Sequence, residues 1–198
     1  MKAFDRDTQV TSVPAKLIAA MERVSTVYKS LLQEQAVIVG LSSLQLQILT
    51  FVAFQDMKDC TTTGMSEEMC MTKGTVSESL RVLVKKGMIV KQQSVKDSRS
   101  FFFRVTQEGL DTVEQCNSLS NVLLNNFSNV ETDKLNRMWL GLSTLLDSLY
   151  AVKGIPSKMC YSCKQYKPLD GNRFRCQLLG KNLSHTELRI DCKEHEAA

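Results

Sequence analysis

The sequence has few of the features that enzymes, membrane proteins and secreted proteins usually require. Its 198 residues include only two histidines, His185 and His195, and no phosphate-binding loop or nucleophile elbow. No apolar run is long enough to span a bilayer. The first twelve residues, MKAFDRDTQVTS, have no apolar core and no cleavage-site pattern, so they do not resemble a secretory signal. We therefore expect no enzymatic activity and no membrane association, and a cytoplasmic location.

The overall composition is that of a globular protein with one or two domains. Hydrophobic residues make up 43% of the chain and charged residues 23%, which is ordinary for a chain that can bury a core. Gly154 and Pro156 interrupt a long helical pattern, and such residues mark linkers. We therefore predict one domain over residues 1–153 and a second, smaller module over residues 154–198.

The segment 65–109 is the most informative part of the sequence. Thr72 is placed to cap a helix, because its hydroxyl can accept a hydrogen bond from a free N–H of the first turn. Gly87 follows two lysines, as is typical where a helix ends. Between these two positions, one face is apolar at helical spacing. Its residues are Val76, Leu80, Leu83 and Val84.

A β-hairpin is predicted directly after this helix. Its strands would be Met88–Gln93 and Phe101–Val105, joined by the polar residues 94–100. Residues 72–106 carry eight Lys and Arg against two acidic residues, a net charge of +6 in a chain whose total is +4. A short helix, expected over Met65–Met69, a second cationic helix and a hairpin together indicate a winged helix-turn-helix that meets phosphates. The cations are Lys73, Arg81, Lys85, Lys86, Lys91, Lys96, Arg99 and Arg104.

This segment resembles the MarR family of winged-helix regulators. Asp97-Ser98-Arg99 followed by Val105-Thr106-Gln107-Glu108-Gly109 is similar to the family's wing signature, D-x-R…(L/V)-T-x-x-G. Thr75-Val76-Ser77 and Leu83-x-x-x-Gly87-Met88-Ile89 resemble its recognition helix and first strand, and residues 41–49 resemble the entry to its second helix. Within that entry, Ser42-x-x-Gln45 is a predicted capping box. The likeness covers about residues 1–153. It implies a mainly α, α+β winged-helix fold and a DNA-binding transcriptional regulator, usually a repressor.

In such a fold, the recognition helix would enter the major groove and the wing would reach the minor groove. Glu78 stands where family members often carry arginine, and a carboxylate there suits a cytosine amino group or an ion pair within the protein. Arg99 would reach the minor groove, and the resemblance implies that Asp97 holds its guanidinium in position. The predicted DNA-contacting residues are Lys73, Thr75, Ser77, Glu78, Arg81, Lys96, Asp97 and Arg99.

Long flanking helices predict a homodimer that reads a palindromic operator. Ser12 begins a predicted helix over about 14–39 with a continuous apolar stripe, and residues 1–11 look irregular. Near the other end, a helix is predicted over about 107–126, and Ser128-x-x-Glu131 resembles a capping box that opens the next helix. After it, Leu135, Met138, Leu142, Leu145 and Leu149 recur at spacings of three and four, which is typical of a coiled-coil seam. In a monomer, the first helix would cover this seam instead of a partner subunit. The resemblance implies that these helices interlock between subunits and leave room for a small-molecule effector.

Four cysteines in the last 39 residues form a second group of candidate functional residues. Cys160-x2-Cys163 is a turn that directs two thiolates toward one point, and Cys176 and Cys192-x2-His195 follow. A segment this short seldom folds without a staple, and clustered cysteines in a cytosolic chain favour a metal over disulfides. We therefore predict Zn²⁺ bound by Cys160, Cys163, Cys176 and Cys192. An iron–sulfur cluster on the same four thiolates, redox-active free thiols and a ligand role for His195 remain alternatives.

Three other functions are open at this point. The first is a metal- or redox-responsive regulator whose cysteine tail is the sensor. The second is a thiol oxidoreductase using Cys160 and Cys163, which lacks a surrounding βαβ pattern. The third is an interaction adaptor whose winged helix does not bind DNA, and the charge of +6 on residues 72–106 speaks against it.

Overall fold

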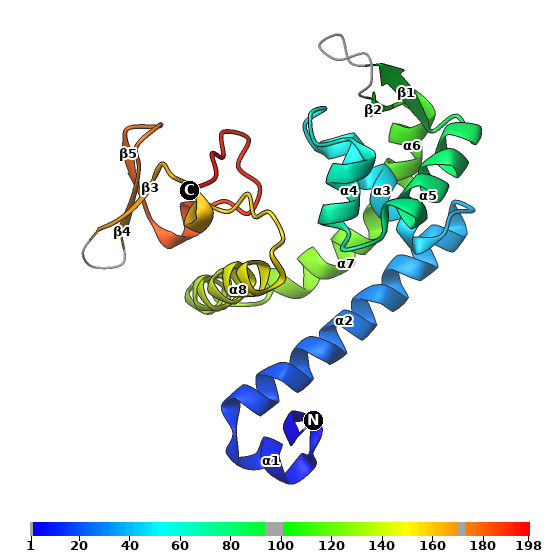
Figure 1. The fold of residues 1–198 in the computed structure, drawn as a ribbon. Coiled ribbons are helices and arrows are strands. Elements are labelled where there is room, and N and C mark those ends of the chain that lie inside the picture. Colours follow the sequence, from blue (N-terminus) through cyan, green and yellow to red (C-terminus); the bar gives the residue numbers. More distant parts are fainter. Residues whose placement is uncertain (1, 94–100, 170–172) are drawn as a thin grey trace. The chain divides into compact units, whose positions relative to one another are not determined.

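The computed structural model describes residues 2–93, 101–169 and 173–198 (Figure 1). The chain divides into two compact units. The first unit combines residues 1–60 with 77–122, and the second combines residues 61–76 with 123–198. Helices dominate both units, and each unit holds one small antiparallel sheet. The predicted boundary between residues 153 and 154 stays a prediction.

The described N-terminal segment is largely helical from Lys2 onward, and so the expected irregular start over residues 1–11 is wrong. The 3₁₀ helix η1 (Lys2–Phe4) is followed by α1 (Arg6–Thr11), which Asp5 caps by accepting a hydrogen bond from the Thr8 N–H at 2.8 Å. Ser12 caps the long helix α2 (Val13–Ile38) as predicted, since its Oγ lies 3.3 Å from the Ala15 N–H that donates to it.

Helix α3 (Ser43–Phe54) begins at the predicted capping box. Ser42 Oγ accepts from the Gln45 N–H at 3.2 Å, and the Gln45 side chain accepts from the Ser42 N–H at 2.9 Å. Leu41 and Leu46, which flank the cap, are both buried. Because the two side chains satisfy two otherwise free N–H groups, this local motif fixes where the helix starts.

The helix-turn-helix consists of α4 (Thr62–Glu68) and α5 (Lys73–Lys85). Helix α4 starts three residues earlier than the expected Met65, because Thr61 caps it by accepting from the Gly64 N–H at 3.0 Å. Thr72 caps α5 as predicted, with its Oγ1 3.2 Å from the Thr75 N–H.

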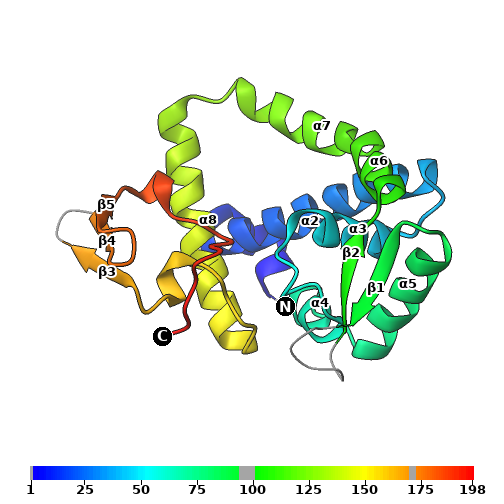
Figure 2. The same ribbon diagram turned by 90° about the horizontal axis from the view of Figure 1, so that it is seen from above.

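The hairpin pairs β1 (Ile89–Gln93) with β2 (Phe101–Val105), close to the predicted bounds, and β2 lies beside α3 and α6 (Figure 2). A compact hydrogen-bonded junction joins it to α6 (Gln107–Gln115). Thr106 Oγ1 accepts from the Gly109 N–H at 3.1 Å and donates to the Gly87 carbonyl at 2.7 Å. The Met88 carbonyl accepts from the Thr106 N–H at 3.0 Å. Thr106 and Gly109, the two defined residues of the T-x-x-G signature, form this junction.

The helical pattern predicted over about 107–126 is interrupted in the structure. Helix α6 ends at Cys116, and α7 (Asn117–Ser128) follows. The predicted capping box Ser128-x-x-Glu131 is wrong: Ser128 lies within α7, and its hydroxyl donates to the Asn125 carbonyl. Helix α8 (Thr132–Lys153) follows Glu131, whose side chain makes no capping hydrogen bond. Gly154 ends α8 in the left-handed conformation.

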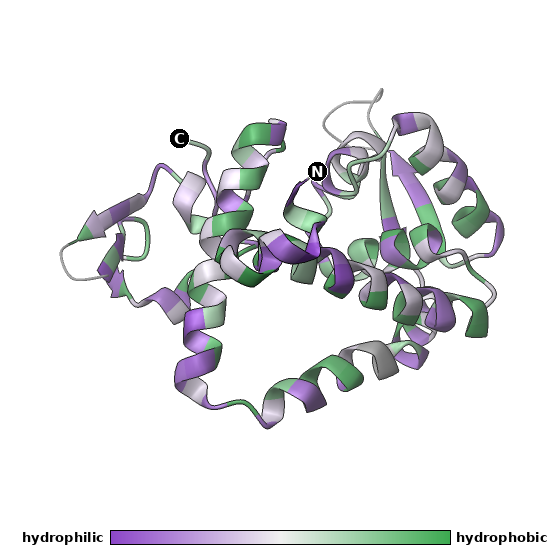
Figure 3. Ribbon diagram, turned by 90° about the horizontal axis from the view of Figure 1, so that it is seen from below, coloured by the Kyte–Doolittle hydropathy of each residue, from purple (hydrophilic) through white to green (hydrophobic). Residues whose placement is uncertain are grey.

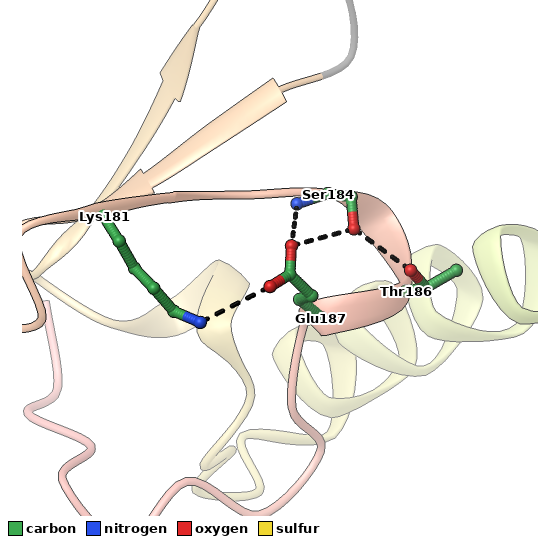
Figure 4. A network of polar contacts seen from close by, with 4 residues as sticks. All are labelled: Lys181, Ser184, Thr186 and Glu187. Carbon is green, nitrogen blue, oxygen red and sulfur yellow. Dashed lines mark hydrogen bonds and ion pairs between the residues drawn. The ribbon is translucent and has the colours of Figure 1, made fainter.

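The tail forms a small sheet with a core of its own. After the 3₁₀ turn η2 (Cys160–Ser162), the strands β3 (Tyr166–Leu169), β4 (Arg173–Cys176) and β5 (Lys181–Leu183) pair in that order. The turn η3 (His185–Glu187) follows, and Glu187 there accepts from the Ser184 N–H at 2.8 Å and from Lys181 at 3.4 Å (Figure 4). The buried core residues are Phe174, Leu183 and Leu188.

Among the described residues, no individual helix is both long and apolar enough to cross a bilayer. Taken together across their 85° bend, α2 and α3 meet the length and composition requirement.

Candidate functional site

Helix α5 buries one face and presents the predicted contact residues on the other. Val76, Leu80 and Leu83 are at most 2% exposed, whereas Val84 is 40% exposed and so is not part of the buried face as predicted. Lys73, Thr75, Glu78 and Arg81 are exposed, and Ser77 is half-buried. The apolar anchor therefore fixes which side chains a duplex would meet.

Glu78 and Arg81 pair with each other one helical turn apart. The Arg81 guanidinium donates to the Glu78 carboxylate, and both side chains are about two-thirds exposed. An exposed pair of this kind contributes little to stability. Of the two roles expected for Glu78, the ion pair within the protein is present in the DNA-free chain.

The hairpin carries further cations. Lys91 and Arg104 are exposed, and the Lys91 ammonium lies 4.0 Å from the centroid of the Phe101 ring. A cation over an aromatic face is held in place without losing its charge. The predicted wing-tip contacts Lys96, Asp97 and Arg99 lie outside the described residues, and their roles stay predictions.

All four tail cysteines line one cavity. Cys160 and Cys163 come from the η2 turn, Cys176 from the end of β4, and Cys192 from the C-terminal segment. Leucine side chains form much of the remaining wall: Leu178, Leu179 and Leu183. The structure therefore brings together the four residues that the sequence analysis grouped.

The cavity alters the acidity of one thiol. Burial raises the pKa of Cys160, the Arg189 N–H opposes this by donating to its Sγ at 3.3 Å, and nearby Cys192 raises it further. Negative charge on these sulfurs would be self-repelling unless a cation were present.

The described chain does not hold a preformed metal site. No three His, Cys, Asp or Glu side chains in it stand close enough together to coordinate an ion as they are. His195 is not among the residues lining the cavity, and its Nε2 lies 3.1 Å from the Ser162 hydroxyl.

Docking of the tail on α8 was not predicted. The Trp139 indole N–H donates to the His185 carbonyl at 2.8 Å, and Ser143, which is fully buried, lies 3.1 Å from the Tyr161 hydroxyl. Trp139 packs against the tail core. A tryptophan on an amphipathic helix was the available signal, because such a side chain usually covers apolar surface and finds a partner for its N–H.

An aromatic series extends this docking surface into the tail. Tyr166 stacks on Phe174 at 5.2 Å between ring centroids, and Phe174 lies 4.7 Å from the His185 ring. Burial raises the pKa of Tyr166 to about 12 and lowers the pKa of His185. Both shifts favour the neutral form of the ring.

Comparisons with known proteins agree with this geometry. Residues 39–100 match a family model described as the MarR family. The fold is similar to that of S. aureus MepR in a DNA complex, with a TM-score of 0.57 and 20% identity over 66% of this chain and 96% of that one. CouR from Rhodococcus jostii RHA1 bound to p-coumaroyl-CoA gives 0.56 and 15% over 72% and 94%. No curated protein matches the sequence.

A further solved structure, described as a MarR family transcription regulator, gives a TM-score of 0.60 and 15% identity over 74% of this chain and 96% of that one. At these identities, structural likeness establishes architecture rather than activity. The mainly helical chain with its small β1–β2 sheet therefore has a MarR-like winged-helix fold.

Proposed function

We propose that this protein is a sequence-specific, DNA-binding transcriptional regulator of the MarR type, acting as a repressor. The observation that carries the proposal is the exposed polar face of α5, where Lys73, Thr75 and Arg81 stand opposite a fully buried apolar anchor. The described cations of residues 72–106 are all exposed, so the segment presents its charge to solvent. The match of residues 39–100 to the MarR family and the likeness to DNA-bound MepR support the same reading.

The proposal includes a homodimer on a palindromic operator. On α2, Leu17, Met21 and Val24 are exposed, and on α8 the predicted seam is exposed from Met138 to Leu149, between 36% and 49% at each stripe leucine. Figure 3 shows hydrophobic and hydrophilic residues interspersed along the helices. Apolar stripes on long helices are stable when another surface covers them. A second copy related by a two-fold axis would cover both stripes and place two α5 helices one DNA turn, about 34 Å, apart.

A small-molecule effector belongs to the proposal as well. CouR, which has a similar fold, is bound to p-coumaroyl-CoA in its solved structure. By that analogy, a ligand would bind this chain and change its affinity for DNA.

Arg81→Ala is expected to weaken operator binding about tenfold and to reduce the salt slope by about one. The guanidinium would lose its contact with a phosphate or a guanine edge. The operator is first selected from random duplexes with the wild-type protein, and the dissociation constant is then measured by fluorescence anisotropy across salt concentrations. Arg6→Ala on α1 is the matched control, because it removes the same charge outside the winged helix.

Wild-type protein that does not bind any duplex at low salt would overturn the proposed function. An Arg81→Ala variant with unchanged affinity and salt slope would instead remove α5 from the interface while leaving DNA binding itself intact.

Leu142→Asp is expected to raise the dimer dissociation constant at least about tenfold, because a carboxylate would be buried without a partner. Leu142 is 49% exposed in the single chain, so the substitution leaves the monomer fold in place. Sedimentation equilibrium measures the change. Asn136→Asp, which adds the same charge on α8 outside the stripe, is expected to leave dimerisation intact; equal effects of the two substitutions would argue against this interface.

A further inference from the structure

The four tail cysteines reach their common cavity from three separate segments. The η2 turn supplies Cys160 and Cys163, with the Cys163 N–H donating to the Cys160 carbonyl at 3.1 Å. Strand β4 supplies Cys176, paired with Tyr166 of β3. The C-terminal segment supplies Cys192, whose N–H donates to the Lys158 carbonyl at 3.1 Å. Backbone pairing therefore sets the position of each of these four residues before any ion is considered.

One backbone contact at Cys160 favours the thiolate, in opposition to the burial that disfavours it. The Arg189 N–H donates to the Cys160 sulfur at 3.3 Å, and the Cys160 N–H donates to the Arg189 carbonyl at 3.2 Å. A peptide N–H aimed at a ligating sulfur stabilises its negative charge and orients it. The tail as a whole carries eight Lys and Arg against five Asp and Glu, a net charge of +3, so an anionic centre would lie in a cationic module.

The tail needs a cross-link that its own core does not supply. Its buried cluster consists of Phe174, Leu183 and Leu188, and modules of about 40 residues with so small a core usually rely on disulfides or a metal. All seven cysteines are free thiols in the structure. A metal ion bound by the four thiols around this cavity would supply that cross-link.

We propose that this cavity binds one Zn²⁺ through the Sγ atoms of Cys160, Cys163, Cys176 and Cys192. Four thiols lose their protons to solvent on binding, and a tetrahedral tetrathiolate of charge −2 forms without any change in oxidation state. The thiols do not yet stand at coordinating distances. Binding therefore draws the η2 turn, β4 and the C-terminal segment inward, until each sulfur lies about 2.3 Å from the ion. Metal binding and ordering of the tail are therefore coupled.

His195 is not a ligand in this proposal. Its ring nitrogen Nε2 is 3.1 Å from the Ser162 hydroxyl, and the Cys192–His195 turn, closed by the His195 N–H donating to the Cys192 carbonyl, leaves the imidazole outside the cavity lining. Four sulfur ligands close a structural zinc site without leaving a position for water.

The test uses the full-length protein, stripped of metal under reducing conditions and titrated with Co²⁺. We expect saturation at one equivalent, with the thiolate-to-metal charge-transfer band and intense visible bands of a tetrahedral sulfur site, and displacement by one equivalent of Zn²⁺. Trp139, the only tryptophan, packs against the tail core, so its emission is expected to shift to shorter wavelength on addition of Zn²⁺.

Variants then assign the ligands. Cys176→Ser is expected to abolish the stoichiometric cobalt spectrum, whereas Cys70→Ser, at an exposed cysteine outside the cavity, and His195→Ala are expected to keep it. Wild-type protein that binds no Co²⁺, or an unchanged spectrum in Cys176→Ser, would overturn the proposal. So would coloured protein that contains iron and acid-labile sulfide as purified. None of these outcomes depends on DNA binding by α5.

Discussion

Replacing Gly109 by alanine is expected to lower the free energy of unfolding by about 3 kcal/mol. A Cβ atom at this position would lie 2.2 Å from the Met88 carbonyl oxygen and 2.8 Å from Val105 Cγ2. The first of these is a backbone atom, and it also accepts the Thr106 N–H, so it cannot move without breaking that hydrogen bond. Urea denaturation followed by circular dichroism measures the loss.

Gly74→Ala is the matched control for this prediction. Its Cβ would find no atom nearer than Thr72 Oγ1 at 3.7 Å, an ordinary contact. Alanine in a helix is favoured over glycine, so stability is expected to rise by up to about 1 kcal/mol. If Gly109→Ala were as stable as Gly74→Ala, the close approach of α6 to the start of β1 would be refuted, and with it the account of the T-x-x-G signature given above.

Trp139→Ala is expected to weaken docking of the tail on α8 by about 3 kcal/mol, and Trp139→Phe by about 1 kcal/mol. The alanine variant loses both the ring that packs against the tail core and the hydrogen bond to the His185 carbonyl. The phenylalanine variant keeps most of the packing and loses the N–H. Hydrogen exchange of the Leu188 amide, which donates to the His185 carbonyl, measures the docking directly.

Arg137→Ala, an exposed position two residues earlier on α8, is expected to leave this exchange rate unchanged. The loss of protection at the Leu188 amide is expected to be largest in Trp139→Ala, smaller in Trp139→Phe and absent in Arg137→Ala, and this order is the most specific part of the prediction. Equal protection in wild type and Trp139→Ala would mean that the tail is held without this contact.

Short-range signals in the sequence predicted the winged helix well. The caps at Ser42 and Thr72 and the strands of the hairpin were found from neighbouring residues alone, because a capping side chain and the N–H that it satisfies are only a few positions apart. The buried face of α5 followed from its period for the same reason. Val84 was assigned wrongly, since its spacing allowed burial and exposure equally.

The errors occurred where a local motif had two readings. Ser128-x-x-Glu131 has the residue types of a capping box, yet Ser128 bonds backward to the Asn125 carbonyl within α7. No glycine or proline marks the interruption at Cys116, so an uninterrupted helix was the natural interpretation. The docking of the tail on α8 joins Trp139 to His185, 46 positions apart, and a contact at that separation has no short-range signature.

The cysteine cluster was predicted from the sequence only in part. Residue types and the Cys160–Cys163 spacing grouped four cysteines that line one cavity, and their role as metal ligands stays a prediction. The role of the Arg189 backbone N–H at the Cys160 sulfur could not be predicted, because a main-chain donor leaves no trace in the identity of the residue that carries it.

For the proposed DNA-binding function, the pairing of Arg81 with Glu78 has a consequence for selectivity among duplexes. A phosphate oxygen competes for this guanidinium with a carboxylate that remains tethered one turn away, so an encounter favours partial exchange of one anion for another. On an arbitrary duplex that exchange gains little, and the displaced carboxylate faces the polyanion unshielded. A site that offers Glu78 a hydrogen-bond donor, such as a cytosine amino group, removes the penalty. Competition by Glu78 for the Arg81 guanidinium would thus shorten the time that the protein stays bound to random DNA more than the time that it stays bound to its operator.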